Sequence, residues 1–149
     1  MNTPLKIFVD TDAFVGLAVQ NDTNHEKALS LVHALTERQV VFFTSNYVFS
    51  ESVTIISQRD SHQAAIAYID KVQSLENPFQ IKRADEALEE EAITIFKQQT
   101  SKNTSFVDCT NMAFMRHLQA DAIFSFDEDY RKNRLPLVAD FLKAEEQAA

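Results

Sequence analysis

Two hydrophobic patterns alternate along this chain. Short apolar runs rich in β-branched and aromatic residues predict buried strands at residues 5–9, 40–43, 79–81 and 122–124. Longer stretches, in which apolar residues recur every three or four positions, predict helices at residues 13–18, 23–38, 46–59, 61–75, 84–99 and 106–119, with a short helix near the end. Because strands and helices alternate, the pattern predicts an α/β fold with a parallel sheet covered by helices on both faces.

Local signals mark where several helices start and stop. The segment from Thr23 to Glu26 has the form of a capping box, and Ser105 followed by Asp108 has the same form. Residues 44–46 are expected to cap the helix that follows them. There are no repeats, low-complexity tracts or linkers, so we expect a single domain over residues 1–149, with a frayed C-terminal tail at residues 144–149.

Acidic residues follow two of the predicted strands directly. Asp10 and Asp12 come after the first strand, and Asp127 comes after the last. In parallel α/β sheets, ligands bind beyond the carboxyl ends of the strands, near the point where the strand order reverses. Each aspartate alone could simply cap a helix. Two strands that deliver carboxylates to the same edge favour a functional site instead.

Two further acids lie within helical patterns. Glu51 interrupts an apolar stripe that includes Val48 and Ile55. A carboxylate there is costly to bury without a partner, and such departures from the pattern are expected at functional sites. The alternative is that Glu51 points to solvent at the edge of the stripe. Asp108 completes a capping box at the start of an apolar helix, where a carboxylate can both cap and bind a ligand.

Composition and charge narrow the chemistry. The chain has 149 residues, 22 acidic and 14 basic side chains, and a net charge of −8. Gly16 is the only glycine, which excludes the glycine-rich loops that bind dinucleotides and nucleotide phosphates. The negative charge argues against wrapping of duplex DNA, although bound cations can reverse the sign of a local site.

A cluster of carboxylates would need such cations. Four acids near one point cannot all stay ionised unless positive charge lies between them. The four histidines have no metal-ligand spacing, and hard oxygen ligands alone favour Mg²⁺ or Mn²⁺ over zinc. The lone Cys109, the absence of a signal-peptide pattern and the shortness of the apolar runs lead us to expect a cytoplasmic protein without a membrane segment.

Four motifs, in order, carry a family resemblance. They are IFVDT at residues 7–11, TSNYVFSE at residues 44–51, SFVDCT at residues 105–110 and FSFDEDY at residues 124–130. With them, the chain from about residue 6 to residue 141 resembles a PIN domain, and among PIN domains the VapC-like ribonuclease toxins of type II toxin–antitoxin systems. The resemblance implies a three-layer α/β/α sandwich around a parallel sheet, with an acidic Mg²⁺ or Mn²⁺ site that hydrolyses RNA.

The resemblance also implies roles for individual residues. It makes Asp10, Glu51, Asp108 and Asp127 the catalytic, metal-binding acids. Its supporting positions are Thr11, Ser125 and Asn46. Two more candidate ligands are Asp129 and Asp12, and at the position of Asp12 the family commonly has Ser or Asn.

Basic residues close behind Asp127 are candidate RNA guides. They are Arg131, Lys132 and Arg134, although a solvated basic loop that balances nearby acids would look the same. The toxin resemblance further implies an RNA substrate, a small antitoxin partner and a homodimer.

Metal-assisted hydrolysis of RNA phosphodiester bonds is therefore the function that the sequence favours. One alternative is a catalytically silent PIN-like scaffold that binds RNA or protein. Another is a haloacid-dehalogenase-like phosphatase, because Asp10-Thr11-Asp12 has the D-x-D form in which the first aspartate attacks phosphate. The later glycine-aspartate loop of that family has no counterpart here, because the only glycine is Gly16.

Overall fold

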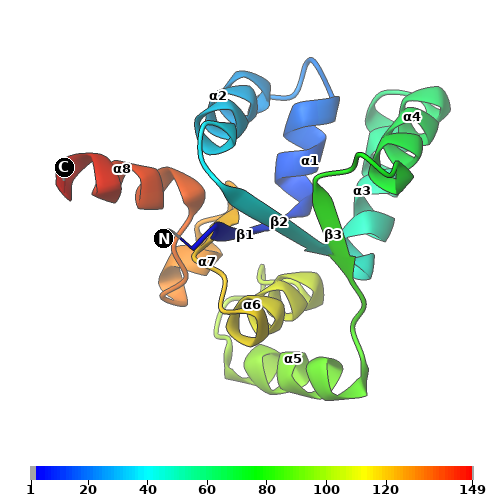
Figure 1. The fold of residues 1–149 in the computed structure, drawn as a ribbon. Helices are drawn as coiled ribbons and strands as arrows, with labels where there is room; N and C mark the ends of the chain where they lie inside the picture. Colours follow the sequence, from blue (N-terminus) through cyan, green and yellow to red (C-terminus); the bar gives the residue numbers. More distant parts are fainter. Residues whose placement is uncertain (1–2, 149) are drawn as a thin grey trace.

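A four-stranded, all-parallel sheet organises the computed structural model, which describes residues 3–148. The strands are β1 (Leu5–Val9), β2 (Val40–Ser45), β3 (Phe79–Lys82) and β4 (Ala122–Phe124), in the order β3-β2-β1-β4. All four lie where the apolar runs predict them, and β2 continues two residues further. The chain steps from β1 to β2 and β3 on one side, and then crosses back to place β4 on the other side of β1 (Figure 1).

Helices cover both faces of this sheet. They are α1 (Thr11–Ala18), α2 (His25–Thr36), α3 (Asn46–Arg59), α4 (His62–Gln73), α5 (Glu86–Gln98), α6 (Phe106–Leu118), α7 (Asp129–Lys132) and α8 (Val138–Ala148). In Figure 1, α1 to α4 lie on one side of the sheet and α5 and α6 on the other. Helix α8 packs against the edge strand β4. The expected three-layer α/β/α sandwich is confirmed.

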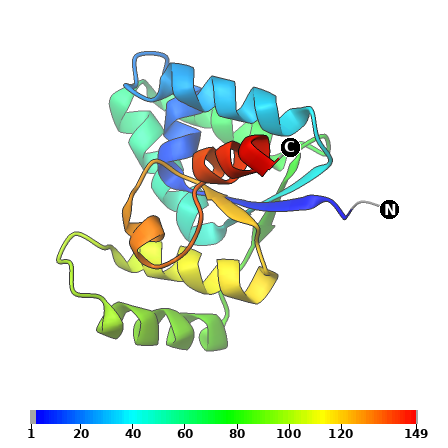
Figure 2. The same cartoon turned by 90° about the vertical axis from the view of Figure 1, so that its left-hand side faces the viewer.

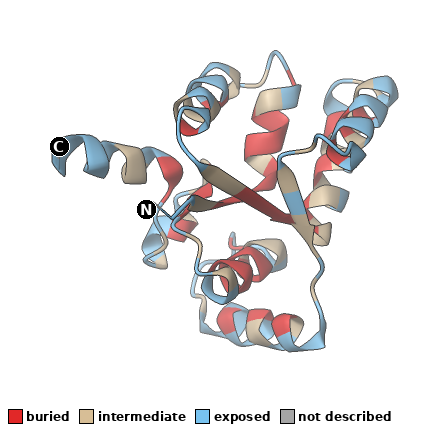
Figure 3. Ribbon diagram, viewed as in Figure 1, coloured by how far each residue is buried: buried red, intermediate tan, exposed pale blue. Residues whose placement is uncertain are grey.

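The core lies between the sheet and these two helical layers. In β1, Ile7, Phe8 and Val9 are completely buried, as a strand covered on both faces should be. Phe8 stacks on Phe114 of α6 with ring centroids 5.7 Å apart. Figure 3 shows the buried residues gathered in the sheet and on the helix faces turned toward it. A rigid, central β1 fixes the position of the residue that follows it, Asp10.

The start of α2 differs from the prediction. The helix begins at His25, its N-cap is Asn24, and no side chain caps it, so the expected box from Thr23 to Glu26 does not form. Asp22 accepts a hydrogen bond from the Asn24 backbone N–H instead (3.0 Å). The His25 ring Nδ1 lies 2.7 Å from the carbonyl oxygen of Gly16 in α1. These contacts order the α1–α2 turn without a capping box.

The C-terminus also departs from expectation. Residues 144–148 belong to α8 and are helical, whereas the sequence suggested a frayed tail over residues 144–149. Glu145 of this helix forms an ion pair with Arg38, which follows the end of α2. Residue 149 lies outside the described part of the chain. Among residues 3–148, none of the helices has the length and apolarity to span a bilayer.

Candidate metal-dependent active site

An acidic pocket lies at the carboxyl ends of β1 and β4. These neighbouring strands lie where the strand order reverses, which is the place where open α/β sheets bind ligands. The pocket has a volume of about 270 Å³. Its acidic lining residues are Asp10, Asp12, Asp22, Glu51, Asp108 and Asp127. The pocket thus brings together all four acids that the resemblance singles out, from β1, α3, α6 and the loop after β4.

Asp10 is the most enclosed of these acids, with 5% of its surface exposed. Its Oδ1 accepts hydrogen bonds from the Thr11 backbone N–H (2.7 Å) and the Asn111 side-chain amide (2.9 Å). Its Oδ2 lies 3.0 Å from Ser125 Oγ and 2.9 Å from the Tyr130 hydroxyl. Burial, followed by the nearby Asp12 and Asp108 charges, raises the pKa of Asp10 from 3.8 to about 8. Asp10 also caps α1, so capping and site formation coincide.

Asp12 ties the start of α1 to the loop after β4. Its Oδ2 accepts a hydrogen bond from the Phe126 backbone N–H (2.9 Å) and lies 3.2 Å from Ser125 Oγ. Ser125 has one hydroxyl proton, so it donates either to Asp12 or to Asp10. Burial is the main cause that raises the pKa of Asp12 from 3.8 to about 6. Asp12 Oδ1 and the neighbouring Thr11 Oγ1 are buried and have no hydrogen-bond partner among residues 3–148.

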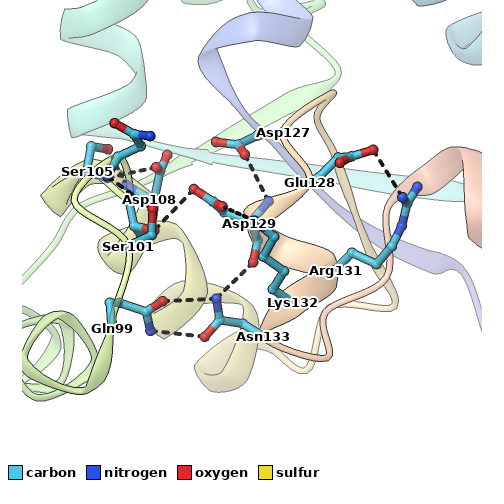
Figure 4. A network of polar contacts seen from close by, with 12 residues as sticks. Gln99, Ser101, Ser105, Asp108, Asp127, Glu128, Asp129, Arg131, Lys132 and Asn133 are labelled. Carbon is cyan, nitrogen blue, oxygen red and sulfur yellow. Dashed lines mark hydrogen bonds and ion pairs between the residues drawn. The ribbon is translucent and has the colours of Figure 1, made fainter.

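Three other carboxylates converge on one point. Asp108, Asp127 and Asp129 each offer an oxygen, and these oxygens lie within 4.8 Å of one another (Figure 4). Asp108 forms the predicted capping box with Ser105, and the pKa of Asp108 is raised by burial and by the charge of Asp127. Asp129 accepts from Thr104 Oγ (3.1 Å), and Asp127 accepts from the Asp129 backbone N–H (2.9 Å). These contacts leave other carboxylate lone pairs free for a cation.

The chemistry of this donor set fits a hard divalent cation. Carboxylate oxygens are the ligands that Mg²⁺ and Mn²⁺ prefer, and like charges this close together need a counter-charge between them. The three oxygens of Asp108, Asp127 and Asp129 could therefore hold an ion beside Asp10.

Glu51 also lines the acidic pocket. It lies on α3, together with Ile55 and Arg59, which line the pocket at intervals of four residues. The break that Glu51 makes in the apolar stripe is therefore the point where α3 faces the acidic pocket. Asn46, at the start of the same helix, lies outside the lining: its side-chain oxygen accepts a hydrogen bond from the Ala84 backbone N–H (3.0 Å).

The three candidate RNA guides lie beside the site and not within its lining. Arg131 makes two hydrogen bonds to Asp140 of α8 (2.9 and 3.1 Å), and these raise the pKa of Arg131 above its usual range. Lys132 lies 3.5 Å from Asp129. Arg134 is exposed and has a positive φ of 62°.

Two polar residues inside the site were missed by reasoning from the sequence. The hydroxyl of Tyr130, which is fully buried, lies 2.9 Å from Asp10 Oδ2 and 3.2 Å from Asp108 Oδ1. Asn111 donates to that hydroxyl (3.0 Å) and to Asp10. One signal was available: Asn111 is a polar residue three positions after Asp108 in an apolar helix, hence on the same helix face.

Replacement of the Tyr130 hydroxyl should impair the site and leave the core intact. In Tyr130→Phe, Asp10 loses one of its four donors and Asp108 loses its link to Asp10. Removal of residues that orient metal ligands typically costs about 10- to 100-fold in activity or metal affinity. We expect a loss of that size in metal-dependent RNA cleavage, measured together with the Mn²⁺ concentration at half-maximal rate. Tyr47→Phe is the control, because its hydroxyl bonds Glu89 outside the pocket (2.5 Å). Equal effects of the two variants would contradict this role.

Comparison with known proteins agrees with this geometry. The PIN domain family matches residues 7–135, and the chain belongs to that family. It is 31% identical over 124 residues to the 23S rRNA-specific endonuclease VapC20 of Mycobacterium tuberculosis, an alignment that covers 83% of this chain and 91% of the relative.

Comparison with solved structures gives the same fold. The crystal structure of Mycobacterium tuberculosis VapC20, described as a sarcin-ricin loop cleaving toxin, matches with a TM-score of 0.78 and 29% identity, over 87% of this chain and 95% of that one. VapBC2 from Rickettsia felis, solved with a promoter DNA fragment, covers 89% of this chain and 97% of its own at 14% identity. FitAcB from Neisseria gonorrhoeae covers 88% and 95% at 13% identity. Both have TM-scores of 0.61 and share the fold.

Proposed function

We propose that this protein is a toxin-like endoribonuclease that uses Mg²⁺ or Mn²⁺ to hydrolyse RNA phosphodiester bonds. The observation that carries the proposal is the convergence of Asp10, Glu51, Asp108 and Asp127 on one pocket at the switch point of the sheet. The likeness to VapC20 supports RNA as the substrate and makes 23S rRNA the first RNA to test. From the toxin resemblance we further propose a cytoplasmic protein that forms a homodimer and has a small antitoxin as its partner.

In this proposal the role of each carboxylate follows from its place in the pocket. Asp108, Asp127 and Asp129 hold the cation, and Asp10 adds negative charge beside it. When bound, the ion lowers the pKa of a water for in-line attack and neutralises the leaving oxygen. Tyr130 and Ser125 keep the Asp10 carboxylate in place, so little reorganisation is needed as charge develops. Glu51 bounds the pocket on the side of α3.

The phosphatase alternative fits this geometry poorly. A nucleophilic aspartate needs a free oxygen, whereas both oxygens of Asp10 have two donors each within hydrogen-bond distance. The second aspartate of the D-x-D pattern, Asp12, has its Oδ2 held by the Phe126 backbone N–H and its Oδ1 buried away from solvent. The presence of Asp10, Glu51, Asp108 and Asp127 around one pocket likewise disfavours a catalytically silent scaffold.

A cleavage assay tests the proposal directly. RNA, including 23S rRNA within ribosomes, is incubated with the protein and EDTA, and Mg²⁺ or Mn²⁺ is then added in excess. We expect cleavage only with the divalent ion, and internal cuts identified by primer extension. Cleavage that persists in EDTA, or no cleavage of any RNA with either metal, would refute the proposal.

A further inference from the structure

One basic side chain lies among the acids of the pocket. Of the lining residues within residues 3–148, only Arg59 is positively charged. It is the last residue of α3, eight positions after Glu51, which places its Cα about 12 Å further along the helix axis. Among the described residues, Arg59 forms its ion pair with Asp22 and not with Glu51. Neutralisation of Glu51 therefore does not account for its position.

Arg59 is anchored on one side only. Its Nη1 contacts Asp22 Oδ1 at 2.5 Å, and the other oxygen of Asp22 accepts the Asn24 backbone N–H. The Asp22 side chain is 10% exposed, so the anchor is firm, whereas the Arg59 side chain is 44% exposed. A guanidinium has five N–H donors in a planar fork, and Asp22 engages one nitrogen. The remaining donors are free to bind a second acidic oxygen.

Arg59 also faces a second hollow. This hollow has a volume of about 480 Å³, and its lining residues are Gln20, Asn21, Arg59 and Asp60. Arg59 therefore lines both the acidic pocket and a polar hollow over the α1–α2 turn. A strand of nucleic acid that enters the acidic pocket and continues past Arg59 would next meet the side-chain amides of Gln20 and Asn21, which can hydrogen-bond bases and sugars, beside the Asp60 carboxylate.

We propose that Arg59 binds a backbone phosphate of the RNA adjacent to the scissile one, and that the strand leaves the acidic pocket over Arg59 into the hollow lined by Gln20 and Asn21. This inference rests on the proposed ribonuclease function. Arginine suits the task because its fork matches phosphate geometry and stays charged. The anchoring by Asp22 orients the fork before the substrate arrives, which limits the entropy lost on binding.

The test measures kcat and KM for a short single-stranded RNA, with Mn²⁺, over a range of salt concentrations. In Arg59→Gln we expect KM to rise about tenfold and kcat to stay within about threefold, as for loss of a hydrogen-bonded charge that positions substrate. The slope of log(1/KM) against log salt should become shallower by about 0.7, the value for one phosphate contact on a single strand. Arg59→Lys should restore the slope, because the charge remains.

Two comparisons separate this role from a structural ion pair. Arg38→Gln removes an arginine that is also paired with an acid, Glu145, but far from the pocket, and should leave KM and the salt slope unchanged. Asp22→Asn breaks the Arg59 pair and keeps the arginine, so the wild-type slope should persist. If Asp22→Asn and Arg59→Gln behave alike, or if Arg59→Gln keeps the wild-type slope, the inference is wrong. If the wild-type protein cleaves no RNA, the proposed function itself has failed.

Discussion

Asp127→Asn should abolish RNA cleavage, with a loss of about 10³-fold or more in kcat/KM. The asparagine retains a side-chain oxygen that can accept the Asp129 backbone N–H, so the loop after β4 keeps its conformation. What disappears is one negative charge from the convergent trio Asp108, Asp127 and Asp129. Metal ions stabilise transition states by several kcal/mol, and about 4 kcal/mol corresponds to a factor of roughly 10³ in rate. The measurement is single-turnover cleavage at saturating Mn²⁺.

A matched substitution at the opposite end of β4 provides the control. Asp121 also accepts a backbone N–H, from Lys6 (2.8 Å), but lies before β4 and not after it. Figure 2 shows that the start of β1 and the site-bearing loop with α7 lie on opposite sides of the molecule. Asp121→Asn should therefore cleave RNA at the wild-type rate. If Asp127→Asn keeps more than about a tenth of the wild-type activity, Asp127 is not an essential metal ligand.

The fold could be predicted from the sequence because its elements are locally determined. The strand at Leu5–Val9 consists mainly of apolar residues and is followed by a charged residue, so the sequence predicts both its burial and its end. The errors occur where tertiary contacts replace local signals. Asp22 and His25 order the start of α2 through contacts to Asn24 and Gly16, and the tail stays helical where Glu145 meets Arg38.

The acidic site could be predicted for a similar reason, and its polar support could not. Asp10 and Asp127 end strands, and Glu51 breaks an apolar stripe, so each is unusual in its own neighbourhood. Tyr130 and Asn111 are not unusual in that way: an aromatic residue and a single amide are common in buried helices. Their roles depend on contacts to Asp10, which lies 120 and 101 positions away in the chain. Arg59 became a candidate only when the structure placed it between two hollows.

Without metal, the protein should lose stability as the pH rises from about 5 to about 8. The folded pKa of Asp10 is about 8 and that of Asp12 about 6, both above the ordinary 3.8. For each group, between pH 3.8 and its folded pKa, the folded state binds more protons than the unfolded state. The free energy of unfolding therefore falls as the pH increases over this range. The contribution is fully present below pH 4 and lost above pH 8. For two such shifts it amounts to several kcal/mol.

Asp10→Asn isolates this effect from the other titrating groups. The oxygen of the new amide can accept the hydrogen bonds from Thr11 and Asn111. Its NH₂ group can donate to the hydroxyl oxygens of Ser125 and Tyr130. These two hydroxyls can then donate their own protons to Asp12 and Asp108. All partners stay satisfied and the buried charge is gone. In EDTA, urea unfolding of this variant should therefore depend much less on pH between 5 and 8 than that of the wild type.

Metal should reverse the trend in the wild type, because a cation replaces the protons that the buried carboxylates otherwise hold. Mn²⁺ is expected to stabilise the folded protein more at pH 8 than at pH 5, since the Asp10 carboxyl, whose pKa is about 8 without metal, holds a proton at the lower pH. Thermal unfolding at the two pH values, with and without Mn²⁺, measures this difference.

Two outcomes would contradict these predictions. If the free energy of unfolding has the same pH dependence in the wild type and in Asp10→Asn in EDTA, the titration of Asp10 does not cause that dependence. A Mn²⁺ effect equally large at pH 5 would place the cation away from Asp10.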